Sequence, residues 1–136
     1  MIDADRSCCN EPAPALLRAG VEQFNRGEYF EQHETLEILW RDEQRAIRRL
    51  YQGILQIGVA LHHLERGNHH GVVYMLRRGS MYLRPFAPAC QGIDVDALLA
   101  DAARALEMVE RLGPGRLDEF DWRLAPRVKW VGSAER

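Results

Sequence analysis

Residues 27–67 read GEYFEQHETLEILWRDEQRAIRRLYQGILQIGVALHHLERG. Apolar side chains recur in this stretch at three- and four-residue intervals, which is the spacing of one face of an α-helix. A glycine stands at each end, and the polar residues 42–44 interrupt the pattern. The stretch therefore predicts two helices, at about 29–42 and 45–66, whose short connection makes them pack antiparallel.

The flanking segments continue the helical pattern. We expect a helix from the proline-containing run 11–14 to Gly27, and another that begins after an Asn68 N-cap. A fifth helix is expected to begin at Asp94 and to end at Gly113. No β alternation is visible. We predict an all-α fold, an antiparallel bundle of about five helices.

The ends of the chain differ from this bundle. We expect residues 1–10 to form a flexible N-terminal tail and residues 11–113 to form the helical domain. Residues 114–136 are expected to form an irregular, aromatic-rich tail that packs on the bundle. Within the bundle, Gly79 falls on the apolar stripe of the fourth helix, which predicts that another helix approaches closely there.

Composition excludes several classes of protein. The chain has 136 residues, of which 46% are hydrophobic and 28% charged, as in one ordinary globular domain. A net charge of -2 argues against nucleic-acid binding, and no apolar run is long enough for a membrane span. Because residues 1–6 contain no apolar stretch, we expect no export signal and a cytoplasmic location.

Charge is unevenly distributed along the chain. Residues 1–40 carry three Arg and eight acidic residues, whereas residues 41–84 carry eight Arg and three acidic residues. This asymmetry is typical of a hairpin of complementary helices. The cluster Arg41, Arg45, Arg48 and Arg49 could bind an anion or RNA, but we expect these side chains to be solvated or paired within the chain.

Three cysteines, Cys8, Cys9 and Cys90, are present. Their odd number and the absence of a CxxC spacing predict neither a disulfide framework nor a zinc site. We expect free thiols in a reducing cytoplasm.

The two central helices carry an unusual set of polar residues. On the first, His33 and Glu37 fall within about 40° of each other. The residues expected on the same, core-seeking side are Tyr29, Phe30, Leu36 and Trp40. The second helix has an aliphatic side formed by Leu50, Ile54, Ile57, Leu61 and Leu64. Opposite this side lies a polar row of Gln52, Gln56, Val59, His63 and Arg66. Burial of such groups is unfavourable without partners, so partners are expected.

The short turn sets the register of this helix pair. His33 is expected level with Gln56, and Glu37 level with Gln52, at hydrogen-bonding distance. His63 lies about 10 Å further along the axis, at 1.5 Å per residue, and is expected to bond near Gly27 and Glu28. This separation disfavours a metal site shared by His33, Glu37 and His63.

Three separated motifs carry a resemblance to a known family. They are GEYFExHExLExxW at residues 27–40, QGILQ at 52–56 and HxxRGN at 63–68. In this order they resemble the bacterial and archaeal domain-of-unknown-function family 309, over roughly residues 20–86. The resemblance implies a small all-α fold, and it implies no established activity, substrate or cofactor.

Three interpretations of the polar residues stay open: a structural network, a ligand-binding or catalytic pocket, and a metal site. The candidate ligand-binding residues are His33, Glu34, Glu37, Trp40, Gln52, Gln56, His63 and Arg66, with His33 and Glu37 as catalytic candidates. We expect no cofactor and no bound metal. The favoured function is binding of a protein partner or self-association, and the alternative is a small enzyme or metal-binding protein that uses His33 and Glu37.

Overall fold

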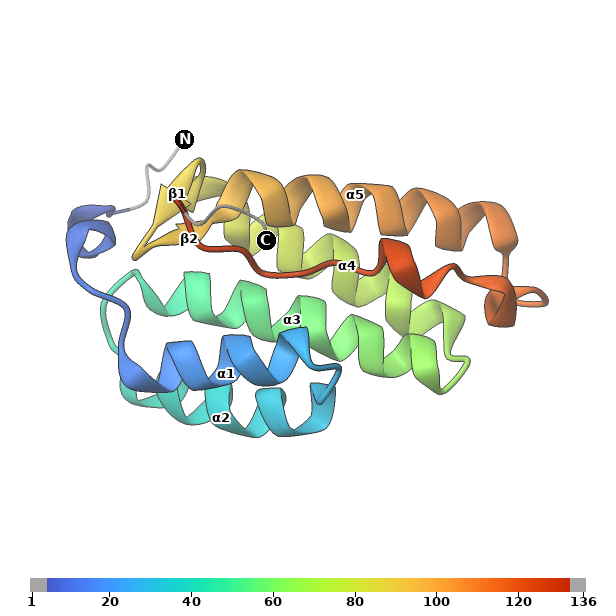
Figure 1. Ribbon diagram of the computed structural model, residues 1–136, viewed down its shortest axis with the longest axis horizontal. Coiled ribbons are helices and arrows are strands. Elements are labelled where there is room, and N and C mark those ends of the chain that lie inside the picture. The colour runs from blue at the N-terminus through green and yellow to red at the C-terminus, as the bar shows by residue number, and fades with distance from the viewer. Residues whose placement is uncertain (1–4, 133–136) are drawn as a thin grey trace.

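Five α-helices make up most of residues 5–132, the part of the chain that this computed structural model describes (Figure 1). They are α1 (Ala15–Asn25), α2 (Tyr29–Asp42), α3 (Arg48–Glu65), α4 (His69–Leu83) and α5 (Val95–Leu112). The predicted all-α bundle is therefore confirmed. No helix within residues 5–132 combines the length and the apolar character needed to cross a membrane.

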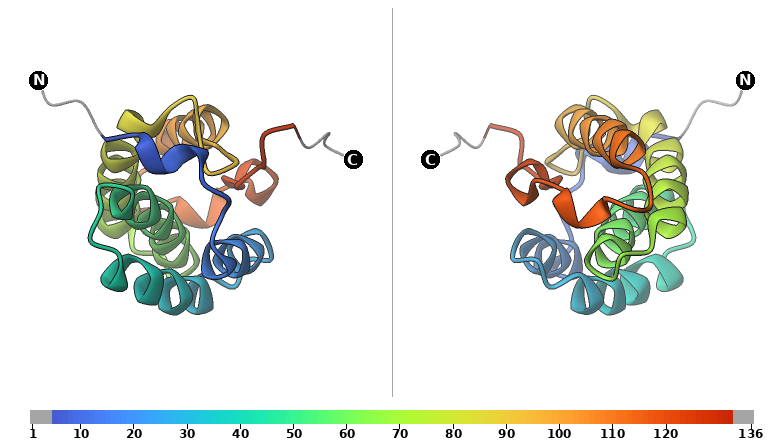
Figure 2. Two further views of the ribbon diagram at one scale, coloured as in Figure 1. Left: turned by 90° about the vertical axis from the view of Figure 1, so that its left-hand side faces the viewer. Right: turned by 90° about the vertical axis from the view of Figure 1, so that its right-hand side faces the viewer.

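Helix α3 lies at the centre of the fold. It packs against α2 on one side and α4 on the other, while α1 packs on α2 and α5 on α4 (Figure 2). Eleven of its 18 residues are buried, including Tyr51, Leu55 and Gly58, which the expected one-sided stripe did not include. A helix that is buried on most of its circumference has no single apolar face.

The predicted helix boundaries are set by caps. Gly27 and Gly67 both have positive φ, at 80° and 73°, and end α1 and α3. The Asn68 side chain accepts a hydrogen bond from the Gly71 backbone N–H at 3.0 Å, and Asp94 accepts one from Ala97 at 3.0 Å. Both N-cap predictions are confirmed.

The close approach predicted at Gly79 occurs between α3 and α4. A Cβ atom placed on Gly79 would lie 3.0 Å from the carbonyl oxygen of Gly53 and 2.8 Å from Ile57 Cδ1. A Cβ on Gly53 would lie 3.1 Å from the carbonyl oxygen of Gly79. The two glycines therefore let the backbones of the two helices touch.

A short antiparallel hairpin, which the sequence did not predict, precedes α5. Its strands are β1 (Ala89–Cys90) and β2 (Ile93–Asp94). The two turn residues, Gln91 and Gly92, have φ of 50° and 82°. Positive φ at both central positions is what a type I′ turn requires, and a Gln-Gly pair is a weak signal for it.

The prediction of free thiols is wrong for two of the three cysteines. Cys9 and Cys90 form a disulfide, and Cys8 is a free, buried thiol. Of the predicted flexible tail, residues 1–4 lie outside the described part, and η1 (Ser7–Asn10) is a 3-10 helix. The Arg6 guanidinium donates hydrogen bonds to the carbonyl oxygens of Pro85, Ala87 and Ala89. Adjacent cysteines give no sequence signal of a partner 81 residues away, because only the fold brings the segments together.

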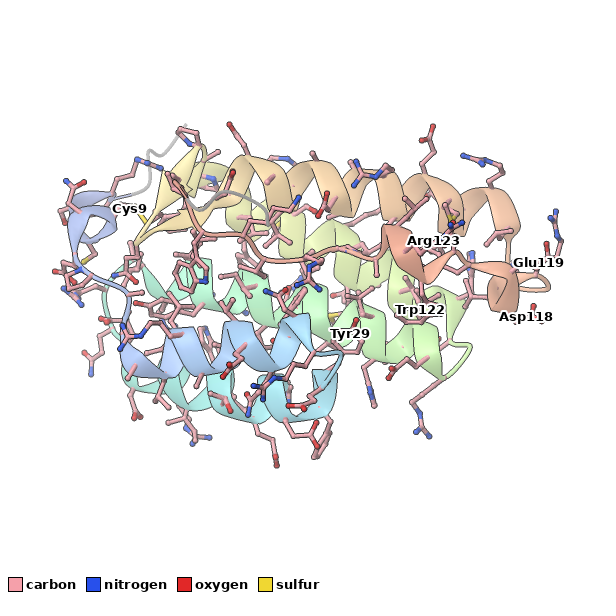
Figure 3. The ribbon with its side chains drawn as sticks, in the orientation of Figure 1. Cys9, Tyr29, Asp118, Glu119, Trp122 and Arg123 are labelled. Atoms are coloured by element: carbon pink, nitrogen blue, oxygen red, sulfur yellow. A yellow bond between two sulfur atoms is a disulfide. The ribbon has the colours of Figure 1, made fainter. Side chains whose placement is uncertain are left out.

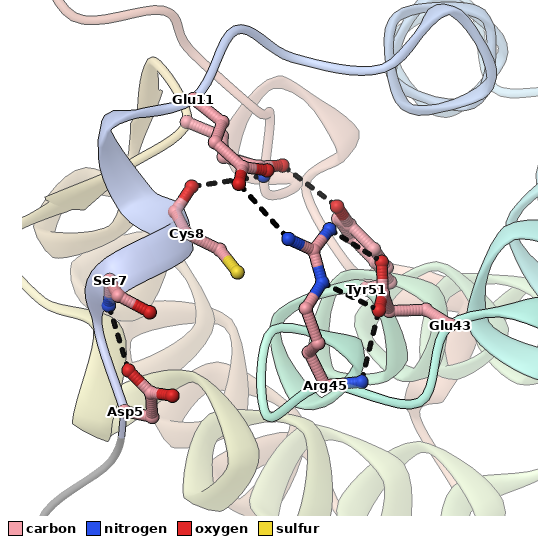
Figure 4. A network of polar contacts seen from close by, with 8 residues as sticks. Asp5, Ser7, Cys8, Glu11, Glu43, Arg45 and Tyr51 are labelled. Atoms are coloured by element: carbon pink, nitrogen blue, oxygen red, sulfur yellow. Dashed lines mark hydrogen bonds and ion pairs between the residues drawn. The ribbon is translucent and has the colours of Figure 1, made fainter.

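Polar contacts join this segment to the core (Figure 4). The Tyr51 hydroxyl donates to Gln91 Oε1 at 2.8 Å, and Gln91 Nε2 donates to the Cys8 carbonyl oxygen at 3.1 Å. Burial raises the pKa of Tyr51 to about 12. The Arg45 guanidinium donates to Glu43 at 2.9 Å and to Glu11 at 3.0 Å. Arg45 is thus paired within the chain, and its hydrogen bonds lower the pKa of Glu43 to about 2.

The segment after α5 runs back along the bundle (Figure 1). Val128 exchanges two hydrogen bonds with the Asn25 side chain at the end of α1, at 2.8 and 2.9 Å. The Arg127 backbone N–H donates to Asp101 of α5 at 3.2 Å. The ring of Trp122 stacks on Tyr29 with centroids 6.5 Å apart (Figure 3). These contacts connect α1, α2 and α5, and residues 133–136 lie outside the described part.

Candidate functional site

A cavity of about 110 Å³ lies between α2 and α3. Its lining residues are His33, Glu37, Trp40, Gln52, Leu55 and Gln56. Five of these six are residues that the sequence singled out, and the antiparallel register places them at one height. Leu55 was not anticipated, because it lies on neither the polar row nor the expected aliphatic side of α3.

The buried face of α2 differs from the predicted one. Tyr29, Gln32 and Leu36 are buried, whereas Phe30 is 55% exposed. The centre of the buried face therefore lies roughly 60° from the expected one, at about 100° per residue. This rotation leaves His33 and Glu37 half-buried at the edge of the cavity.

Gln32 is the polar residue that the sequence analysis missed. It is fully buried, and its Nε2 donates to the Leu55 carbonyl oxygen at 3.2 Å. A Cβ atom on Gly58 would lie 2.3 Å from this nitrogen, so the glycine makes the space for the amide. The available signal was the spacing from Tyr29 to Gln32 to Leu36, which is that of a helix face.

Two polar atoms of the lining residues have no protein partner. Across residues 5–132, four buried side-chain atoms lack a hydrogen bond, and two of them are Trp40 Nε1 and Gln56 Oε1. The indole N–H is a donor and the amide oxygen an acceptor. Arg48 covers the Trp40 ring, with its guanidinium carbon 4.8 Å from the ring centroid. Two of the lining residues therefore each carry a buried polar atom without a partner, one of them a donor and the other an acceptor.

The hydrogen bonds that the register predicted across the helix pair do not form. Gln52 Oε1 accepts instead from Arg49 at 2.5 Å. In the described part of the chain, no hydrogen bond joins His33 to Gln56 or Glu37 to Gln52. The prediction is wrong in this respect because the cavity lies between the two sets of side chains.

The remaining candidates lie elsewhere. His63 Nδ1 pairs with Asn68 Nδ2 at 3.2 Å, and its ring covers Gly71 at the start of α4. The predicted contact with Gly27 and Glu28 is wrong because Asn68 follows the end of α3 and reaches the ring first. Burial lowers the pKa of His63. Glu34 and Arg66 are exposed and do not line the pocket.

The lining side chains offer hydrogen bonding and, at His33 and Glu37, groups that can take up or release a proton. Within the described residues, no three His, Cys, Asp or Glu side chains are grouped as a metal site. His33 and Glu37 can exchange protons, whereas the lining includes no serine, threonine or cysteine nucleophile. The arrangement can orient a small polar group through hydrogen bonds.

Fold and pocket define the chain as a small all-α domain with a polar cavity inside an antiparallel helix hairpin. The model of a family described as "Domain of unknown function (DUF309)" matches residues 17–75, which include the whole pocket lining. The resemblance to this family is therefore confirmed over α1, α2, α3 and the first part of α4.

The chain is also similar to a protein of Aquifex aeolicus (strain VF5) described as "Uncharacterized protein". The two are 24% identical over 105 residues, which is 75% of this chain and 31% of the other protein. The chain thus spans about a third of the length of that relative.

Proposed function

We propose that this chain is a binding domain whose α2–α3 pocket receives a small, uncharged group with both a hydrogen-bond acceptor and a donor. The observation that supports the proposal is the pair of buried, unpartnered atoms Trp40 Nε1 and Gln56 Oε1 in the lining residues of one cavity. A buried polar atom without a partner destabilises a fold by about 1–3 kcal/mol. A ligand that pairs both atoms removes that penalty.

The volume limits the ligand. A cavity of about 150 Å³ holds benzene, which has six heavy atoms. A cavity of about 110 Å³ therefore suits a group of about four or five heavy atoms. A primary carboxamide has this size, with a carbonyl oxygen to accept from Trp40 and an NH₂ group to donate to Gln56.

Charge favours a neutral ligand. Glu37 lines the pocket, so an anion would meet like charge there, and the two nearby arginines already contact the lining residues Trp40 and Gln52. A cation would gain from Glu37, but it would meet the like charge of Arg48, whose guanidinium carbon lies 4.8 Å from the Trp40 ring centroid. A neutral amide avoids both unfavourable contacts.

The alternative function from the sequence is a small enzyme with His33 and Glu37 as an acid–base pair. Both residues line the same cavity, and this placement supports it. Binding is the better-supported function because the unpartnered atoms of Trp40 and Gln56 match a bound polar group, and an acid–base reaction does not require them.

The proposed location remains the cytoplasm, and one observation opposes it. Disulfides are rare in the cytoplasm of mesophiles, whereas Cys9 and Cys90 are joined. A thiol-blocking reagent applied to intact cells distinguishes an oxidising from a reducing location. One blocked cysteine per chain indicates the disulfide, and three indicate a reduced chain.

Titration with acetamide, followed by ¹H–¹⁵N correlation spectra, tests the pocket. The chain has three tryptophans, so three indole N–H signals are expected, and Trp40→Phe identifies the one from Trp40. Acetamide should shift the Trp40 signal along a saturable curve and leave those of Trp122 and Trp130 unchanged. Gln56→Met should weaken this binding at least fivefold, whereas Glu34→Gln, which lies outside the pocket, should leave it unchanged. A Trp40 signal that moves only linearly and together with the other two would contradict the proposal.

A further inference from the structure

The outward faces of α2 and α4 expose large apolar side chains. Phe30 and Ile38 on α2 are 55% and 43% exposed, and Tyr74 and Met81 on α4 are each 48% exposed. These four are a majority of the seven large hydrophobic residues that are exposed within residues 5–132. Clustered exposed apolar residues with charged neighbours mark interaction surfaces more often than scattered ones do.

The two exposed apolar residues of each helix have charged neighbours that are mostly of one sign. The acidic face of α2 consists of Phe30, Glu31, Glu34, Ile38 and Asp42, with Arg41 as a single cation at its end. The basic face of α4 consists of His70, Tyr74, Arg77, Arg78 and Met81, which together with Val73 line a groove of about 450 Å³. The two faces are therefore complementary in charge as well as in apolar character.

The spacing along the helices also matches. Phe30 and Ile38 are eight residues apart, about 12 Å along the axis, and Tyr74 and Met81 are seven apart, about 10 Å. Glu34 lies midway between the apolar pair of α2, just as the two arginines lie between the apolar pair of α4. If the apolar pairs meet, Glu34 therefore faces Arg77 and Arg78.

One copy of the chain cannot join these faces by itself. Helices α2 and α4 pack on different sides of α3 (Figure 2), and the four apolar side chains are between 43% and 55% exposed. Complementary surfaces that point outward on one molecule can meet only between molecules. We propose that a second copy of this chain docks the acidic face of its α2 on the basic face of α4.

The basic face is arranged for such contact. Arg78 donates to the hydroxyls of Tyr74 at 3.3 Å and Tyr82 at 3.1 Å, which holds its guanidinium across the apolar surface. Arg77 pairs with Glu110, and both side chains are more than 40% exposed. Exposed pairs contribute little to stability, so Glu34 of another copy can replace Glu110 at small cost.

The contact is head-to-tail, since it joins two different faces. Contacts of this kind build rings if they close and filaments if they do not. Charge contributes much of the attraction, and screening at about 1 M salt reduces its range to about 3 Å. Association is therefore expected to rise with protein concentration and to fall with salt.

Sedimentation velocity of the full chain at 10–200 µM, in 25 mM and 500 mM NaCl, tests the proposal. The wild-type chain should exceed its 15.6 kDa monomer mass at low salt and return to it at high salt. Iodoacetamide in all samples prevents disulfide exchange between copies. A wild-type chain that stays monomeric at 200 µM and low salt overturns the proposal.

Charge reversal identifies the faces. Glu34→Arg alone and Arg77→Glu alone should each weaken association at least tenfold. The double variant Glu34→Arg/Arg77→Glu should restore it, and so should an equimolar mixture of the two single variants. Glu107→Arg and Arg111→Glu on α5 change the charge equally and should have no effect. Thermal melts check that each variant folds.

Met81→Gln removes an apolar contact without a change of charge and should weaken association at least threefold, whereas Leu16→Gln on α1 should not. Association that persists in both single charge variants, or that fails to return in the double variant and in the mixture, overturns the assignment of these faces. The acetamide titration is independent of this result, because Glu34 and Arg77 do not line the α2–α3 pocket.

Discussion

Gly79→Ala should destabilise the protein through the contact between α3 and α4. The added methyl group would lie 3.0 Å from the Gly53 carbonyl oxygen and 2.8 Å from Ile57 Cδ1. The isoleucine can change its rotamer, whereas the backbone oxygen can move only if the whole helix moves. The two helices must then separate by a few tenths of an ångström.

Two opposing effects set the magnitude. Alanine is about 1 kcal/mol more favourable than glycine inside a helix. Overpacking of a buried contact is unfavourable by about 1–3 kcal/mol, and a backbone obstacle favours the upper part of that range. We expect a net loss of about 1–2 kcal/mol, which lowers the melting temperature by roughly 3–8 °C for a chain of this size.

Thermal and urea unfolding followed by circular dichroism measure the effect. Gly115→Ala is the matched control, since a Cβ atom there meets nothing within 4 Å, and it should leave stability unchanged or slightly raised. A Gly79→Ala variant that is about 1 kcal/mol more stable than wild type would show that helix propensity alone determines the change in stability. That result would refute the close contact between the helices.

Three further predictions follow from the caps, the disulfide and the ion pair. Asn68→Ala should lose about 1 kcal/mol in urea unfolding with the loss of its N-cap hydrogen bond, whereas Asn10→Ala should not. Denatured, unreduced protein should show one thiol per chain with Ellman's reagent, and three thiols would exclude the disulfide. The double variant Cys9→Ser/Cys90→Ser should lose up to about 4 kcal/mol of unfolding free energy, because the disulfide closes a loop of 81 residues. The hydrogen bonds from Arg45 lower the pKa of Glu43 to about 2, so they stabilise the fold above the unfolded pKa near 4.5, and this contribution is lost as pH falls toward 2. Glu43→Gln should flatten that part of the stability–pH curve, and an unchanged slope would contradict the pairing.

The parts of the fold that are set locally could be predicted from the sequence. The ends of α1 and α3 at Gly27 and Gly67, and the caps Asn68 and Asp94, depend on a few neighbouring residues. The contact at Gly79 could also be predicted, because a glycine on an apolar stripe indicates the approach of another helix.

Features that depend on distant segments could not be predicted. The Cys9–Cys90 disulfide joins residues that only the completed fold brings together. The rotation of α2 depends on Gln32, which is buried because Gly58 on α3 leaves room for its amide. A polar residue in such a position carries no apolar signal, so the hydrophobic pattern of α2 alone favours the wrong phase.

The candidate site was predictable in position and not in detail. The short turn between α2 and α3 fixes the height of His33, Glu37, Gln52 and Gln56, and all four line one cavity. Whether the side chains across the hairpin bond to each other or leave a space depends on side-chain packing. Arg49 takes the oxygen of Gln52, and this contact within α3 was not visible in the pattern.

The stability of Gln56→Met, measured by urea unfolding without ligand, tests most directly whether the pocket is built for binding. Methionine has nearly the shape of glutamine and removes the unpartnered acceptor. If the pocket keeps polar atoms unpaired for a ligand, Gln56→Met should be about 1 kcal/mol more stable than wild type. Gln52→Met, which removes an oxygen already bonded to Arg49, should show no gain. A loss of about 1 kcal/mol or more in Gln56→Met would show that Gln56 holds the helices together, and would contradict the binding function.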